Sequence, residues 1–327
     1  MNAIRRILVA VKDPKAKSFP AVDKAAQLAR AFGAELELFH SISMPLYIEA
    51  LGPSNKSLPE LEHTWRQELT RHLEVAAKRA NKFGVEATIN VQWDYPVYEA
   101  VLRRAKKIKA DLIVAGCHDG KHHAAGLLQL SDWELLRLSP VPVLLVKNAT
   151  PYKNPVVLAA IDPLHTFAKP ARLDGEILKT GTAFKSALRG TLHAVHAYVP
   201  MLVGLPPSEY LKPDLAARLD TGAKGLVKTS FEREVRAASI PPARRHLVGK
   251  HQLDAIPETV RKTGSAIVVM GAISRSGLKR FFIGNTAEQL IDRVDCDVLI
   301  VKPPHFKNDV RRGSRGVHLL AAPSLVA

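Results

Sequence analysis

Short apolar runs alternate with amphipathic segments along this chain. In its first half, five runs have the length and pattern of strands: 4–11, 35–41, 85–93, 112–115 and 141–147. Four segments between them carry apolar residues at three- and four-residue steps, as helices do: 22–32, 58–83, 96–108 and 131–138. This alternation predicts a parallel sheet with helices on both faces and right-handed crossovers.

The second half repeats the same order. Strands are predicted at 156–161, 191–199, 243–248, 266–270 and 297–302, and helices at 171–188, 213–238, 256–263 and from Asn285 onward. Gly116 and Gly271 follow the fourth strand of each half, and Lys147 and Lys302 close the fifth. Self-similarity over about 150 residues indicates domain duplication, because solenoids repeat over about 20–50 residues. We expect α/β domains with doubly wound parallel sheets at 1–150 and 151–304, and a flexible basic tail at 305–327.

Composition fits a soluble, globular, cytoplasmic protein. Hydrophobic residues make up 46% of the 327 residues and charged residues 24%. No apolar run approaches the length of a membrane span, and the N-terminal segment lacks the pattern of a signal peptide. Cys117 and Cys296 lie in different halves without CxxC spacing, which predicts neither a disulfide framework nor a zinc site.

The formal net charge is +16 and is unevenly distributed. Residues 1–150 hold 21 Lys and Arg against 16 Asp and Glu, whereas residues 151–327 hold 26 against 15. A basic balance attracts nucleic acid, anionic lipid and phosphorylated ligands alike, and it also fits a merely solvated surface. Interleaved aromatic residues and recognised nucleic-acid modules are missing, so we expect no specific nucleic-acid partner.

The stretch around 265–303 has the outline of an anion site. A buried strand ends at Gly271, and the loop after it contains the cations Arg275, Lys279 and Arg280 and no carboxylate. Asn285 and the residues after it then open a helical pattern. Glycines allow backbone N–H groups to approach an anion, and a helix start presents unpaired donors.

These residues resemble the phosphate loop of the universal stress protein family. That family carries Gly, two residues, Gly, nine residues and then Gly-Ser/Thr between its fourth strand and last helix. Gly271 and Gly284 match the first and last glycines, Ser274 replaces the second, and Asn285-Thr286 replaces the usual helix start. A Cβ at Ser274 would crowd the close backbone approach that glycine permits.

The resemblance covers about 4–303 and implies a fold and a ligand. Each repeat is expected to have five strands in the order 3-2-1-4-5, as in adenine-nucleotide alpha-hydrolase-like folds. The two repeats would pair as a pseudo-dimer, and further dimerisation of the whole chain stays open. The implied ligand is ATP or a related phosphorylated nucleotide, held by the second repeat.

Residue by residue, the resemblance assigns a nucleotide site in the second repeat. Asp162 would lie on the adenine side after the first strand, and the backbone of Ala197 would meet the adenine. Asp162 fits equally well as a turn residue before Pro163. The remaining predicted contacts come from one loop and the helix after it: Met270, Gly271, Ser274, Arg275, Gly277, Gly284, Asn285 and Thr286.

The first repeat departs from the pattern. Asp119 stands opposite Ser274, and Gln129 and Leu130 stand opposite Gly284 and Asn285. An acidic side chain repels an anion, so we predict that this repeat does not bind a nucleotide. Its loop contains three histidines: His118, His122 and His123. We interpret them as solvated side chains rather than as ligands of a metal site.

Signatures of enzymes are missing. We find no GxSxG, HExxH or Walker sequence, so no catalytic residue and no metal ligand is predicted, although slow ATP hydrolysis stays open. The resemblance implies a stress-response regulatory protein that binds a ligand. The alternative is a nucleotide-independent carrier of a lipid-like or other small hydrophobic ligand, lined by the Pro-rich apolar segment 200–207.

Overall fold

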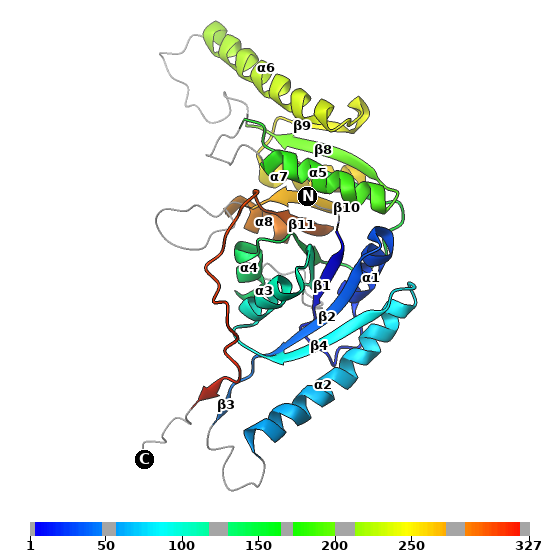
Figure 1. The fold of residues 1–327 in the computed structure, drawn as a ribbon. Helices are drawn as coiled ribbons and strands as arrows, with labels where there is room; N and C mark the ends of the chain where they lie inside the picture. The colour runs from blue at the N-terminus through cyan, green and yellow to red at the C-terminus, as the bar shows by residue number, and fades with distance from the viewer. Residues whose placement is uncertain are drawn as a thin grey trace. The chain divides into compact units, whose positions relative to one another are not determined.

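A computed structural model describes residues 4–47, 57–117, 130–164, 173–199, 213–272 and 285–320. The chain divides into two units. The first unit comprises Asn2–Pro151 together with Lys307–Ala327, and the second comprises Tyr152–Phe306. In each unit, parallel strands and helices alternate along the chain, which confirms the predicted α/β class (Figure 1).

The first unit is built on five parallel strands: β1 (Arg6–Ala10), β2 (Glu35–Ile42), β4 (Ala87–Trp93), β5 (Leu112–Gly116) and β6 (Val143–Val146). They pair in the order β4-β2-β1-β5-β6, which is 3-2-1-4-5 when these strands are counted along the chain. Residues Ile7–Val9 of the central strand are 0% exposed because helices cover both of its faces. A strand buried on both faces reads as a continuous apolar run, which is why the sequence pattern located it.

Four helices cover this sheet: α1 (Pro20–Phe32), α2 (Leu58–Asn81), α3 (Val97–Ile108) and α4 (Leu130–Leu138). α1 contacts α2, and α3 contacts α4. At the start of α2, the Ser57 N–H donates to Oε2 of Glu60 at 2.9 Å, which satisfies a donor that a helix start leaves unpaired. Nε of Arg79 in α2 donates to Asp23 in α1 at 2.9 Å and joins these two helices.

The second unit repeats this plan with β7 (Val156–Ala160), β8 (Thr191–Ala197), β9 (Arg245–Val248), β10 (Ser265–Gly271) and β11 (Asp297–Val301). These strands are parallel and pair in the order β9-β8-β7-β10-β11. Its helices are α5 (Leu173–Ala187), α6 (Pro213–Ala237), α7 (Gln252–Thr263) and α8 (Asn285–Arg293). α5 packs on β7, β8 and β10, and α7 contacts α8.

Helix α7 begins four residues before the predicted position of 256. His251 caps it, because its Nδ1 accepts the Leu253 N–H at 3.3 Å. Pro257 lies inside the helix and cannot donate to the Leu253 carbonyl four residues earlier. Nη1 of Arg293 donates to that carbonyl at 3.3 Å instead, so a side chain of α8 replaces the missing backbone donor.

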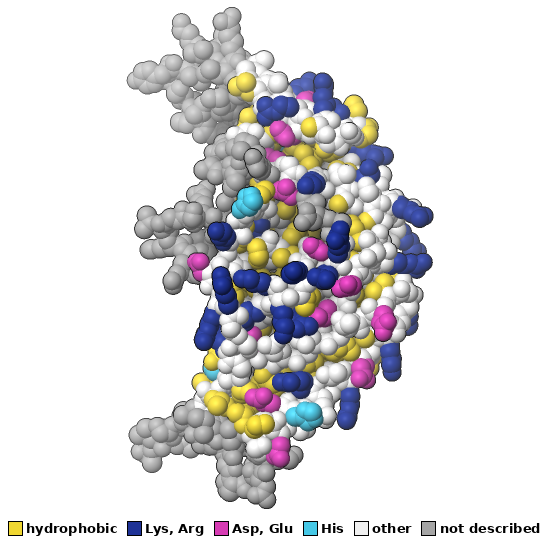
Figure 2. All heavy atoms as spheres, in the orientation of Figure 1, with side chains coloured by type: hydrophobic (Ala, Val, Ile, Leu, Met, Phe, Trp, Pro, Cys, Tyr) yellow, Lys and Arg dark blue, Asp and Glu magenta, His cyan; other side chains and the backbone are white. Residues whose placement is uncertain are grey.

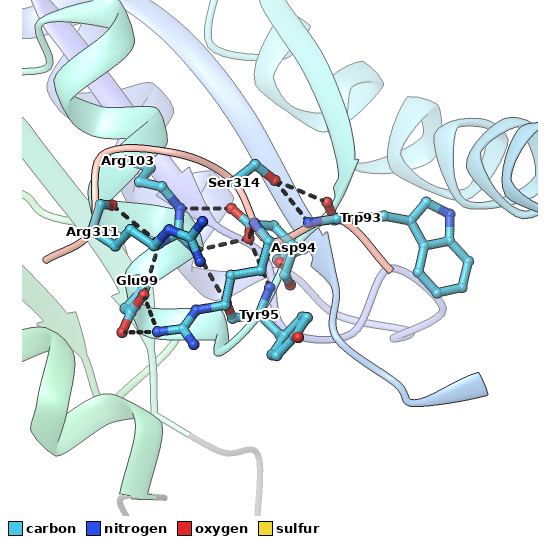
Figure 3. A network of polar contacts seen from close by, with 10 residues as sticks. Trp93, Asp94, Tyr95, Glu99, Arg103, Arg311 and Ser314 are labelled. Atoms are coloured by element: carbon cyan, nitrogen blue, oxygen red, sulfur yellow. Dashed lines mark hydrogen bonds and ion pairs between the residues drawn. The ribbon is translucent and has the colours of Figure 1, made fainter. Parts of the chain in front are cut away.

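The C-terminal segment differs from the flexible tail that we expected. Residues Leu319–Leu320 form β12, which pairs in parallel with β3 (Leu46–Tyr47), in a segment for which neither a strand nor a helix was predicted. Arg315 reaches Glu99 at 3.1 Å. The Arg311 carbonyl accepts a hydrogen bond from Arg103 (Figure 3). Pairing between dipeptides this far apart in the sequence leaves no periodic signal, which is why the sequence did not reveal it.

Charged side chains are spread over the surface. On the face drawn in Figure 2, Lys and Arg are interspersed with Asp, Glu and neutral side chains. The helices α2 and α6 are long but rich in charged residues. Over the described ranges, no helix is both long and apolar enough to cross a membrane. The pairing of the two repeats as a pseudo-dimer stays a prediction.

Candidate functional site

The predicted nucleotide contacts that the structure describes lie at one edge of the second unit's sheet. Ala160 lies opposite Met270, and Gly271 opposite Val301, at the carboxyl ends of β7, β10 and β11. Ala197 ends β8 at the same edge, opposite Val248. Ligands of open parallel sheets bind beyond this edge, at the point where the strand order reverses. In this unit the reversal lies between β7 and β10.

Gly271 is required for packing at this edge. A Cβ built on it would lie 2.5 Å from Cδ2 and 2.8 Å from Cγ of Leu173, the first residue of α5. The missing side chain therefore lets α5 approach the end of β10. The preceding Met270 is 4% exposed and belongs to the apolar core.

The loop that carries Asp162 is held by two residues that the sequence analysis did not assign to the site. The Asp162 N–H donates to Oδ1 of Asp174 at 3.1 Å, and Asp174 is 2% exposed in the first turn of α5. The Ile161 carbonyl lies 3.0 Å from Nδ1 of His196, so that nitrogen carries the proton of this hydrogen bond. Two sequence signals could have identified them: a carboxylate at the start of a helix for Asp174, and a histidine within a buried strand for His196.

Much of the predicted phosphate loop lies outside the described residues, namely Ser274, Arg275, Gly277 and Gly284. The helix after it begins at Asn285, as predicted, with Thr286 as its second residue. The side chains of these two residues are also outside the description. The structure thus locates the helix start and the strand end that flank the loop.

Lys302 is a further cation at this edge, directly after β11. It is 6% exposed, and its Nζ has no hydrogen-bond partner within the described part of the chain. Nζ lies 4.9 Å from the centroid of the Phe306 ring. Burial lowers the pKa of the Lys302 amine from 10.5 to about 8. In the sequence, this lysine is marked only as the residue that closes the fifth strand of the repeat.

Strand alternation indicates which way Lys302 faces. A Cβ on Gly271 would point at α5, and Val301 is its partner in the register, so Val301 shares that face. Successive strand residues point to opposite faces. Continued by one residue past the end of β11, this alternation would turn Lys302 away from α5, at the edge where α8 begins.

The corresponding region of the first unit is described only in part. Asp119, Gln129 and the three loop histidines lie outside the described residues, and Leu130 opens α4. Asp13 accepts the Lys15 N–H at 2.8 Å, as a turn residue does. Where side chains are described, no group of three or more His, Cys, Asp or Glu could hold a metal ion. The Pro-rich segment 200–207 also lies outside the description.

Comparison with known sequences finds one family along most of the chain. A model of the universal stress protein family matches residues 3–147 and 177–302. Universal stress protein E of Salmonella typhi is 26% identical over 321 residues, which cover 94% of this chain and 98% of that protein. Universal stress protein E of Photorhabdus laumondii is 24% identical over 314 residues, which cover 93% of this chain and 97% of that protein.

Solved structures show the same fold. A functionally unknown protein from Pseudomonas aeruginosa PAO1 matches with a TM-score of 0.69 at 22% identity, over 92% of this chain and 93% of that one. A universal stress protein from Archaeoglobus fulgidus matches with a TM-score of 0.63 at 17% identity, over 96% of this chain and all of that one.

Proposed function

Because this chain belongs to the universal stress protein family, we propose that it is a cytoplasmic stress-response protein whose second unit binds an adenine nucleotide or a related phosphorylated ligand. In this proposal the protein binds and senses its ligand and carries no catalytic or metal-binding residue.

The observation that carries the proposal is the buried amine of Lys302. A buried ammonium without a hydrogen-bond partner among the described residues is costly, and an anion within reach would offset that cost. The first N–H groups of α8 lie at the same edge and favour negative charge. A phosphate group placed there would satisfy both the amine and the helix start.

The other proposed contacts follow from the family resemblance and from the sheet edge. Asp162 and the backbone of Ala197 would meet the adenine, next to the apolar Met270. Gly271 and the first residues of α8, Asn285 and Thr286, would flank the phosphates. Between them, the loop residues Ser274, Arg275, Gly277 and Gly284 would hold the phosphate oxygens.

Titration calorimetry with ATP tests the proposal at one fixed salt concentration. A charge-assisted hydrogen bond contributes about 1.5–3 kcal/mol, so Lys302→Met is expected to weaken ATP binding by about ten- to a hundredfold. Gly284→Val should also weaken it, because a branched side chain would block the approach of a phosphate. Comparing ATP, AMP and adenosine separates the phosphate contribution from that of the base.

A surface lysine of the same unit provides the control. Lys250 pairs with Glu258 at 2.7 Å, and both side chains are more than half exposed. Lys250→Met should leave ATP affinity unchanged. If ATP and AMP do not bind to the wild-type chain, the nucleotide function is wrong. If ATP binds and neither Lys302→Met nor Gly284→Val changes its affinity, the ligand lies elsewhere.

A further inference from the structure

The first unit contains a pocket that is independent of the nucleotide proposal. Its volume is about 400 Å³, which is within the range of small-molecule sites. It lies at the carboxyl edge of the sheet, where β1 and β2 end, and α2 and α3 complete its lining. Most of its lining side chains are apolar, among them Ile42, Met44, Trp65, Leu69, Val97 and Val101.

The polar side chains that line this pocket carry no uncompensated charge. Nζ of Lys12 lies 2.6 Å from Oδ2 of Asp132, whose side chain is 4% exposed, so a carboxylate already balances the ammonium. Nδ1 of His40 lies 2.8 Å from the Val11 carbonyl. Burial lowers the pKa of His40 from its ordinary value, which favours the neutral ring. A phosphate or carboxylate would therefore find no free cation among the described lining residues.

The C-terminal segment 307–320, which we call the strap, holds two walls of the pocket. On one side, β12 pairs with β3, and the Leu46 N–H donates to the His318 carbonyl at 2.8 Å. Leu46 lies two residues after Met44 of the pocket lining. On the other side, the Arg315 N–H donates to Oδ1 of Asp94 at 2.9 Å, just before α3 begins.

An ionic cluster with two buried carboxylates fixes the strap to the start of α3 (Figure 3). Arg103 donates to both oxygens of Asp94 at 2.7–2.8 Å and to Glu99 at 2.7 Å. Asp94 is 1% exposed and Glu99 is 8% exposed, so two buried carboxylates share this one guanidinium. Arg315 supplies the second positive charge through contacts of 3.1 and 3.2 Å to Glu99. These four charges balance only when the strap is in place.

Aromatic contacts add to this attachment. The His318 ring stacks on Tyr95 with a centroid distance of 4.2 Å and an interplanar angle of 13°. Cζ of Arg315 lies 5.7 Å from the centroid of the same Tyr95 ring. Val97 of the pocket lining lies two residues after Tyr95, between it and Glu99, so releasing the strap would free the wall that contains Val97.

We propose that the pocket of the first unit binds a small, neutral and predominantly apolar molecule, and that the strap controls access to it. The lining selects the ligand class, because burying apolar surface is favourable and the paired Lys12 offers nothing to an anion. The strap limits entry, because it ties the segment after β2 to the start of α3.

Two fluorescent probes on the full chain test the ligand class. N-phenyl-1-naphthylamine is neutral and apolar, and 8-anilinonaphthalene-1-sulfonate has a similar aromatic skeleton with a negative charge. We expect saturable 1:1 binding of the neutral probe, with energy transfer from Trp65 in the pocket wall, and weaker binding of the sulfonate. Leu69→Trp should weaken binding of the neutral probe by about tenfold or more, because it fills the pocket.

A second filling variant guards against misfolding. Met44 is 47% exposed, so Met44→Trp narrows the pocket from a position that tolerates a larger side chain. Thermal unfolding of both variants shows whether the fold is retained. Unchanged affinity of the neutral probe in two folded filling variants would refute the site. Tighter binding of the sulfonate than of the neutral probe would also refute it. So would a neutral probe that binds neither wild type nor Arg315→Ala.

Stopped-flow association of the neutral probe tests the strap. Arg315→Ala removes the contact to Glu99 and is expected to raise the association rate by about five- to thirtyfold. Arg315→Lys keeps the charge but not the planar guanidinium, so its rate should be intermediate. The exposed Arg312 of the same segment provides the matched control, and Arg312→Ala should behave as wild type. Equal rates for Arg315→Ala and wild type would refute control by the strap.

Discussion

Replacing Lys302 with methionine should stabilise the second unit at neutral pH. The folded chain holds the Lys302 pKa at about 8, against 10.5 in the unfolded chain, so folding disfavours the charged amine. At about 1.4 kcal/mol per pH unit, this lowering of the pKa corresponds to about 3 kcal/mol of lost stability below pH 8. The Phe306 ring under the ammonium recovers about 1 kcal/mol. Methionine keeps the length of the side chain and its contact with the ring, so the expected gain is about 2–3 kcal/mol.

The sign of the pH dependence follows from the direction of the pKa change. Above pH 10.5 the amine is neutral in both states and costs nothing. As the pH falls toward 8, the unfolded chain takes up the proton first, and the penalty on the folded chain grows. The advantage of Lys302→Met should therefore be about 2–3 kcal/mol at pH 7 and below about 1 kcal/mol at pH 10.

Urea denaturation followed by far-UV circular dichroism measures this difference. With a slope of about 2 kcal/mol per molar urea, the midpoint at pH 7 should rise by about 1 M. All three tryptophans belong to the first unit (Trp65, Trp93 and Trp133), so their fluorescence follows that unit separately. Lys250→Met, at an exposed ion pair, should shift the midpoint little. A midpoint for Lys302→Met that is unchanged, or a gain that does not shrink toward pH 10, would refute the reasoning.

Three further predictions concern other parts of the fold. Gly271→Ala should destabilise the second unit by about 1–3 kcal/mol, since its Cβ would lie 2.5 Å from Leu173; a urea midpoint equal to wild type would contradict this. The pKa of His246 is lowered by burial, so stability should fall as the pH drops below 6.5, and His246→Gln should flatten that fall in melting temperatures taken between pH 7.5 and 5.5. Melting temperatures of wild type and His246→Gln that fall equally with pH would contradict this role of His246. Asp94→Asn should cost about 1–3 kcal/mol in the tryptophan-detected transition, because Arg103 loses one of its two carboxylate partners and keeps only Glu99; a loss below about 0.5 kcal/mol would contradict this.

The fold could be predicted because its strands are buried on both faces. In β10, the residues from Ile267 to Met270 are at most 4% exposed, and an apolar run of this kind is typical of a strand that is covered on both sides. The start of α8 was also predictable, since Asn285 is a strong capping residue. The start of α7 was not, because His251 is a weak capping signal that depends on the position of its ring.

The candidate site was predictable only where glycines and strand ends mark it. Gly271 and Ala197 lie at the edge that the strand pattern indicated. Lys302 was overlooked, because whether a terminal lysine is solvated or buried depends on the packing around it. The pocket of the first unit was hidden for a similar reason: Trp65 and Leu69 follow the apolar stripe of a helix, and such a stripe predicts core packing rather than a cavity.

The strap also bears on the order in which the protein is completed during synthesis. A ribosome delivers the first unit's sheet early, but Arg315 and β12 emerge only after the whole of Tyr152–Phe306. At about 5–20 residues per second, that interval is on the order of ten seconds or more. Throughout it, Asp94 and Glu99 share a single guanidinium, and the edge of β3 has no partner from the C-terminal segment. A nascent chain that stalls within the second unit therefore presents an unfinished first unit, which chaperones or proteases could distinguish from the finished one.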